Sequence, residues 1–235
     1  MMDYKEQLLQ LGHADALNVS SQELHARVEG TIAKTFMWMG AILLIAFTVA
    51  YGTSTQILPI PFSSTLAWIS WIGGFGLIML MSWRWQKMSY ATLASLLLLF
   101  GLLEGYGLTG VFLSYTGSSI FQVFLMSAGM FFWLAVAGYY LHIDIARVGP
   151  ILLVALIVLI VGMVVNAFWG NATFDIRLSV IGLILFAGLI IYDMNVLKQQ
   201  ALIDDSRIPI LMSLGLFINF INIFLFLLRI FGNRN

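Results

Sequence analysis

The sequence is poor in charged residues and contains no cysteine. Only 9% of its 235 residues are Asp, Glu, Lys or Arg, whereas a soluble domain carries about 25%. The absence of cysteine excludes disulfides and thiolate chemistry. Apolar residues make up 61% of the chain. This composition predicts an integral membrane protein, so we expect the lipid bilayer to be its main partner and expect no nucleic-acid partner.

Apolar runs long enough to cross a bilayer recur along the chain. A helix needs about 20 apolar residues to span a hydrocarbon core of about 30 Å. We predict seven such helices, at residues 35–51, 64–83, 91–113, 119–141, 150–169, 178–197 and 208–231. The four prolines support these limits, because we place Pro59, Pro61, Pro150 and Pro209 between spans or in their first turn. We also expect Trp38, Trp68, Trp71, Trp83, Trp85 and Trp169 to anchor the spans at the membrane interfaces.

The basic residues predict the orientation of the helices, because Lys and Arg are retained on the cytoplasmic side. Residues 1–34 are polar and are predicted to form a cytoplasmic tail, with residues 35–235 forming the membrane domain. With the N-terminus inside, eight basic residues lie on the inner side: Lys5, Arg27, Lys34, Arg84, Lys87, Arg147, Lys198 and Arg207. Three lie outside, Arg177, Arg229 and Arg234. Re-entry of the last span would move the last two inside.

Small and polar residues within the spans indicate how the helices associate. Membrane helices pack through close approach at small residues and through interhelical hydrogen bonds. Five glycines are predicted to form such contacts: Gly73, Gly74, Gly76, Gly101 and Gly105. In the last span, four residues share one predicted helical face: Gly215, Asn219, Asn222 and Arg229. The alternative for the two asparagines is a purely structural role in joining helices.

Two carboxylates lie within predicted spans, Glu104 and Asp193. An ionised group near the bilayer centre costs about 2.5–3.5 kcal/mol, so each needs a physical reason. The structural alternatives are a protonated Glu104 that bonds a neighbouring helix and an Asp193 that reaches the headgroups. No predicted span contains histidine, which argues against intramembrane hydrolases, and the last span lacks the lysine that a retinal protein needs. We therefore expect no catalytic residues, no metal site and no cofactor.

Four stretches give the chain a family resemblance. They are "EGYGLTGVFL" at 104–113, "YYLHIDIARVG" at 139–149, "LFAGLIIYDMNVL" at 185–197 and "LFINFINIFLFLLRIFG" at 216–232. In this order they resemble the transmembrane Bax inhibitor motif family, and its small bacterial members in particular. The resemblance implies an all-α bundle of seven transmembrane helices, with the last helix at the centre and wrapped by the other six. It also implies a protein of the bacterial inner membrane that acts as a pH-sensitive calcium leak.

The resemblance also implies a latch between the last two helices, formed in the family by two aspartates. The first is Asp193, which follows Tyr192, but the second position is occupied by Asn219. An amide is neutral at every pH and can donate a hydrogen bond, so Asp193 would be the single titrating member of a degenerate pair. Asn222 and Glu104 are predicted to line the ion route beside it. We expect a weak calcium site at best, because calcium prefers six to eight oxygens.

A second function remains open. The resemblance also implies relatives that modulate a membrane-bound AAA protease, so the alternative is a non-transporting protein that binds this or another membrane protein. The loss of the second aspartate and the polar tail of residues 1–34 favour that alternative.

Overall fold

The computed structural model describes residues 20–235, so residues 1–19 of the predicted tail lie outside the described part. Seven α-helices fill the described chain: α2 (Ser21–Ser54), α3 (Ser64–Arg84), α4 (Tyr90–Ser114), α5 (Gly117–Tyr140), α6 (Ile145–Trp169), α7 (Ala172–Gln200) and α8 (Ile208–Phe231). A short 3-10 helix, η2 (Trp85–Lys87), follows α3. All seven α-helices are long and apolar enough to cross a membrane, which confirms the predicted all-α fold with seven candidate spans.

Local sequence determines where most of these helices begin. Side-chain oxygens just before the first turn accept hydrogen bonds from backbone N–H groups that would otherwise lack partners. Five helices have such caps: Ser20, Ser89, Thr116, Asp144 and Asn171. At Ser20 the cap is reciprocal, because Glu23 also accepts from the Ser20 backbone N–H. Helix α2 therefore begins at Ser21, and residues 21–34 of the predicted tail are helical and continuous with the first span.

Pro150 lies elsewhere than predicted. We expected it in the first turn of its span, but α6 begins at Ile145 and Pro150 lies inside the helix. The earlier start follows from Asp144, whose side chain caps the helix by accepting from the Arg147 N–H. Pro59 and Pro61 lie between α2 and α3, and Pro209 lies in the first turn of α8, as predicted.

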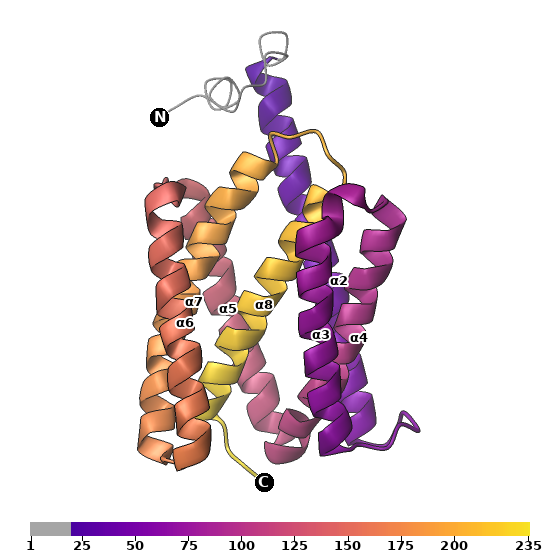
Figure 1. The fold of residues 1–235 in the computed structure, drawn as a ribbon, viewed down its shortest axis with the longest axis vertical. Helices are drawn as coiled ribbons and strands as arrows, with labels where there is room; N and C mark the ends of the chain where they lie inside the picture. The colour runs from indigo at the N-terminus through magenta and orange to yellow at the C-terminus, as the bar shows by residue number, and fades with distance from the viewer. Residues whose placement is uncertain (1–19) are drawn as a thin grey trace.

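The helices pack in two groups with α8 running obliquely between them (Figure 1). Helix α4 packs against α2 and α3, while α7 packs against α5 and α6. Helix α8 contacts α2, α3, α4, α5 and α7 and is the most buried of the seven spans. Helix α6 packs mainly on α7, so the predicted enclosure of α8 by all six other helices is not confirmed.

Glycine allows the closest helix approach in the bundle. A Cβ atom added at Gly105 would lie 2.6 Å from the backbone oxygen of Ala46, so α4 and α2 meet almost backbone to backbone. Gly101 also faces α2, and Gly73 faces α4, as predicted. The prediction for Gly76 is wrong, because a Cβ atom there would meet nothing within 4 Å.

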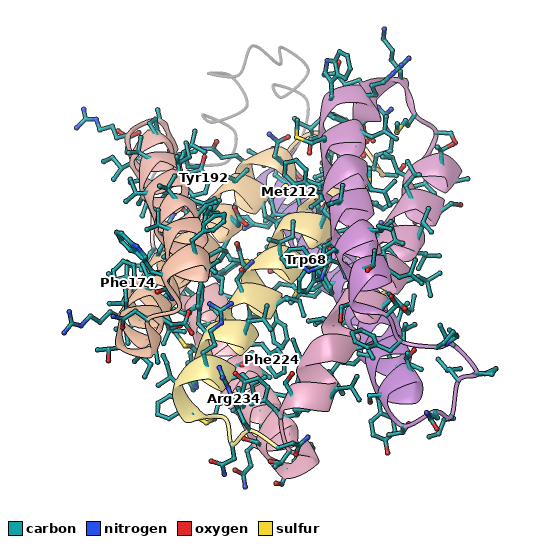
Figure 2. All side chains as sticks on the ribbon, turned by 60° about the horizontal axis from the view of Figure 1, so that its bottom comes forward. Trp68, Phe174, Tyr192, Met212, Phe224 and Arg234 are labelled. Atoms are coloured by element: carbon teal, nitrogen blue, oxygen red, sulfur yellow. The ribbon has the colours of Figure 1, made fainter. Side chains whose placement is uncertain are left out.

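The outer surface of the bundle is apolar. Large apolar side chains project outward around the helices (Figure 2), and among the most exposed are Trp83 at 85% and Phe168 at 87%. A surface of this kind suits a hydrocarbon environment, where backbone polar groups must be satisfied within the helices. Helix α8 is one uninterrupted helix of 24 residues, and the described chain ends at the pole of the bundle opposite the start of α2 (Figure 1). This geometry favours a full crossing by α8 over re-entry.

Candidate functional site

The first polar site of the bundle joins α7 to α8. The Asn219 Nδ2 donates a hydrogen bond of 2.7 Å to Oδ2 of Asp193. Asn219 is buried, and the Asp193 carboxylate lies against Gly215, where an added Cβ atom would be 3.3 Å from Oδ2. The structure therefore brings together the two residues at which the sequence predicted a latch. The missing side chain at Gly215 is what makes room for the carboxylate.

No basic side chain within residues 20–235 forms an ion pair with Asp193. The nearest lysine on its helix, Lys198, instead donates from Nζ to the backbone oxygens of Tyr139 and Leu141, at 2.8 and 3.2 Å. It thereby satisfies carbonyl groups at the end of α5 that lack helical partners. Asn195 does not bond Asp193 either, because its Nδ2 donates to the backbone oxygens of Gly138 and Ile191, at 3.1 and 2.9 Å. The Asp193 carboxylate thus depends on the Asn219 amide.

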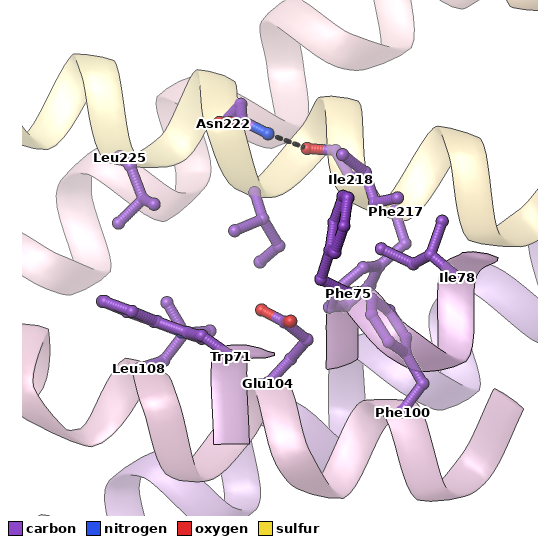
Figure 3. Close-up of a pocket in the computed structure, with 11 residues that line it drawn as sticks. Trp71, Phe75, Ile78, Phe100, Glu104, Leu108, Phe217, Ile218, Asn222 and Leu225 are labelled. Carbon is purple, nitrogen blue, oxygen red and sulfur yellow. Dashed lines mark hydrogen bonds between the residues drawn. The ribbon is translucent and has the colours of Figure 1, made fainter. Parts of the chain in front are cut away.

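The second polar site is a cavity of about 280 Å³ bounded by α3, α4 and α8. Glu104 and Asn222 contribute its polar groups, and aromatic side chains provide much of its wall, including Trp71 and Phe75. The Glu104 carboxylate lies between the Trp71 and Phe75 side chains and faces α8 (Figure 3). The Asn222 Nδ2 donates to the backbone oxygen of Ile218 at 2.8 Å.

The four predicted site residues therefore occupy two places. Asp193 and Asn219 are in contact, and Glu104 and Asn222 line one cavity, but neither Asp193 nor Asn219 is among the cavity residues. Asn219 and Asn222, which we predict to share one helical face, therefore meet different neighbours in this structure. The reason is that α8 has neighbours on several sides, so residues on one broad face meet different helices.

Sequence reasoning missed a third polar contact, at the end of the bundle where α8 stops. Arg229 Nη1 lies 3.4 Å from Oδ1 of Asp175, and both side chains are about one-third exposed. The sequence predicts that Arg229 lies on the outer side and shares the polar face of its helix, but it gives Arg229 no partner. A usable signal was present, because α7 and α8 are consecutive antiparallel helices. Residues that are at similar distances along α7 and α8 from the connecting loop lie side by side. Asp175 and Arg229 are one such pair, and Asp193 and Asn219 are another.

Trp71 also has a different role from the one predicted. We expected it to be an interfacial anchor, but its indole packs directly over Gly107 of α4 and lines the cavity beside Glu104. Across residues 20–235, no three His, Asp or Glu side chains are grouped in a way that would hold a metal ion. The chemistry available at the cavity is therefore that of a single carboxylate, an amide and aromatic rings.

Seven apolar helices and a polar contact between the last two define a polytopic α-helical membrane protein. The family model described as "Inhibitor of apoptosis-promoting Bax1" matches residues 28–235, and the chain belongs to this Bax inhibitor motif family. The chain is 34% identical to a protein of Borreliella burgdorferi over 212 residues, covering 86% of this chain and 91% of that protein. It is 33% identical to the inner membrane protein YbhL of Escherichia coli K12 over 219 residues, covering 89% and 94%.

Proposed function

We propose that this chain is a passive ion leak, permeable to calcium, in a bacterial inner membrane, and that it is not an enzyme. The name of the Escherichia coli relative YbhL, an inner membrane protein, supports the location. The observation that carries the proposed activity is the 2.7 Å hydrogen bond from Asn219 to Asp193. In this proposal that contact holds α7 against α8 and closes the route, and its separation opens the route.

The oxygen ligands available to calcium suit a leak better than a tight binding site. Calcium takes six to eight oxygen ligands, usually including several carboxylates. The proposed route offers one carboxylate at Asp193, another at Glu104, and the amide oxygens of Asn219 and Asn222. Conduction requires that an ion bind well enough to enter and weakly enough to leave. A sparse set of oxygens in two separate places suits passage better than storage.

Calcium flux into proteoliposomes containing the purified full chain tests this proposal. We expect flux above that of empty vesicles, with some dependence on pH from Asp193. Asn219→Asp should make the pH dependence steeper between about pH 5 and 8, because two carboxyl groups in contact must share a proton and titrate as a pair. Asp193→Asn removes the titrating group of the α7–α8 contact, so the pH dependence that this contact contributes to the flux should be lost over the same range.

Asp204→Asn is the matched control for these variants. This carboxylate is in the loop between α7 and α8 with its side chain 85% exposed, so its loss should leave the pH profile unchanged. Flux equal to that of empty vesicles at every pH would reject the leak. Superimposable pH profiles of Asn219→Asp and the natural chain would reject the role of the Asp193–Asn219 contact.

A second candidate function, supported by the start of α2, is restraint of another membrane protein, such as a membrane-bound AAA protease, without transport. Helix α2 begins well before its apolar part and projects beyond the other helices (Figure 1). Leu24 and Val28 pack against Ala201 and Leu202 after α7, which holds this projection in place and leaves residues such as Glu29 exposed. A fixed and exposed polar helix offers a surface for a partner.

Co-purification with partners from bacterial membranes distinguishes this candidate from the leak. Deletion of residues 2–28 would remove the buried Leu24 and Val28, so deletion of residues 2–19 together with Glu29→Lys is a cleaner change. A restraining protein should lose its partner and a leak should keep its calcium flux. Retention of every partner by the altered chain would reject a partner site on this part of the molecule.

A further inference from the structure

The cavity between α3, α4 and α8 contains a carboxylate without a partner. Glu104 forms neither a hydrogen bond nor an ion pair with any other residue of the described range 20–235. It lies in the middle of α4, so an ionised form would be within the hydrophobic layer. Such a group needs either a proton or a cation, and the cavity leaves room for a cation.

The walls of the cavity are suited to one kind of cation. Trp71 and Phe75 lie on either side of the Glu104 carboxylate, and Phe100 packs edge to face on Phe217 with centroids 5.4 Å apart (Figure 3). Aromatic faces attract cations through the negative potential of their π systems, and tryptophan does so most strongly. One carboxylate surrounded by aromatic rings is the arrangement that recognises organic ammonium ions.

The cavity is open on the side that would face lipid. Phe75 lines it and is also 63% exposed, and it lies in the middle of α3. The packing of α3 against α8 is slight compared with that of α3 against α4, so this side is less tightly closed. A ligand would therefore enter from the hydrocarbon layer, which requires it to be lipophilic.

We propose that this cavity binds a lipophilic organic ammonium ion, whose charge is paired by Glu104 and whose alkyl groups contact Trp71 and Phe75. The cavity volume of about 280 Å³ limits the ligand to a small ammonium group or to the head of a larger amphiphile. The proposal does not depend on ion flux through the protein, and it goes beyond the leak. A calcium ion would find one carboxylate and one amide here, far from the six to eight oxygens that it prefers.

Substitution of Gly74 provides a way to displace the Glu104 carboxylate without removing it. A Cβ atom at Gly74 would lie 2.7 Å from Oε1 of Glu104, which is the mobile end of a side chain. Gly74→Ala should therefore move the carboxylate at little cost to the fold. Gly76→Ala, on the same helix, is the matched control because its Cβ atom would meet nothing within 4 Å.

Calorimetric titration of tetrapropylammonium, a more lipophilic quaternary ammonium ion than tetraethylammonium, into the purified full chain in maltoside micelles free of other ammonium groups tests the proposal. We expect saturable binding that Glu104→Gln weakens by about tenfold, because a charge-assisted contact is lost. Trp71→Leu should weaken it by about fivefold, in keeping with one cation–π contact. Gly74→Ala should weaken binding and Gly76→Ala should not. Calcium should not displace the probe at equal concentration.

The proposal would be overturned by the absence of saturable binding, by equal affinity in Glu104→Gln, or by equal affinity in the two glycine variants. A loss in Asp193→Asn as large as in Glu104→Gln would also overturn it, since the ion would then be held at the α7–α8 contact. Each variant is first compared with the natural chain by circular dichroism and gel filtration. If Glu104→Gln does not fold, the Gly74→Ala and Gly76→Ala pair decides the outcome.

Discussion

The contact between Asp193 and Asn219 makes a quantitative prediction about stability. Asn219 is 5% exposed and its Nδ2 lies 2.7 Å from the Asp193 carboxylate, so replacing either residue by leucine removes a short hydrogen bond from a largely buried place. A hydrogen bond to a charged group contributes about 1.5–3 kcal/mol in soluble proteins, whereas cycles in a membrane protein average about 0.6 and reach about 1.7. We expect a coupling of about 1.5 kcal/mol, since the donor is buried and the bond is short.

The assay is a double-mutant cycle of Asp193→Leu, Asn219→Leu and the double variant. The free energy of unfolding is measured by denaturation with sodium dodecyl sulfate in mixed micelles. Asp193→Leu with Asn222→Leu is the control cycle, because Asn222 donates to Ile218 of its own helix. Its coupling should stay within about 0.5 kcal/mol of zero. Equal couplings in the two cycles would refute the inference that Asp193 depends on Asn219 in particular.

Three further predictions concern a glycine contact, an ion pair in a loop and the membrane topology. Gly105→Ala should lower the free energy of unfolding by about 1–3 kcal/mol, because its Cβ atom clashes with α2. Gly129→Ala, whose Cβ atom would meet nothing within 4 Å, should raise the free energy of unfolding by at most about 1 kcal/mol. Hydrogen bonds from Arg207 lower the pKa of Asp205. The stabilisation that they provide is therefore present above about pH 4 and is lost as the pH falls. The melting temperatures of the natural chain and of Asp205→Asn should accordingly differ at pH 7 and converge at low pH. A reporter fused after Asn235 should be active outside and one in the α7–α8 loop inside; activity of both inside would contradict the predicted topology.

The helices of this protein could be predicted well because lipid imposes a strict rule on sequence. Backbone groups in hydrocarbon must bond within the helix, so each span needs a long apolar run, and such runs are conspicuous. The predicted start at residue 64 and the predicted limits of the last span, 208–231, agree with α3 and α8. Polar ends are harder to predict, because helices continue into water without an apolar signal. That is why the sequence predicts a tail where the first fourteen residues of α2, from Ser21, are helical.

Side-chain neighbours could be predicted only where chain geometry fixes them. The family resemblance implied the contact of Asp193 with Asn219, and the short loop between the antiparallel helices α7 and α8 is consistent with it. The side chains that surround Glu104 depend on how α3 and α8, far apart in sequence, pack around α4, and no short-range pattern specifies this. Trp71 was therefore expected at an interface, although it lies in the cavity wall. The family resemblance supplied the contact between α7 and α8 but gave no information about the cavity.

An asparagine at position 219 changes what the contact between α7 and α8 can respond to. The Asn219 amide carries no charge at any pH and keeps its donor, so it can bond Asp193 whether or not that carboxyl group is protonated. Two aspartates at this place would need a shared proton to remain in contact, and losing it would drive the helices apart. In this chain the partner cannot lose its proton, so any response to pH must come from Asp193 alone. The contact should therefore stay closed over a broader pH range than a shared-proton pair would, which is why the flux profile of Asn219→Asp distinguishes the two arrangements.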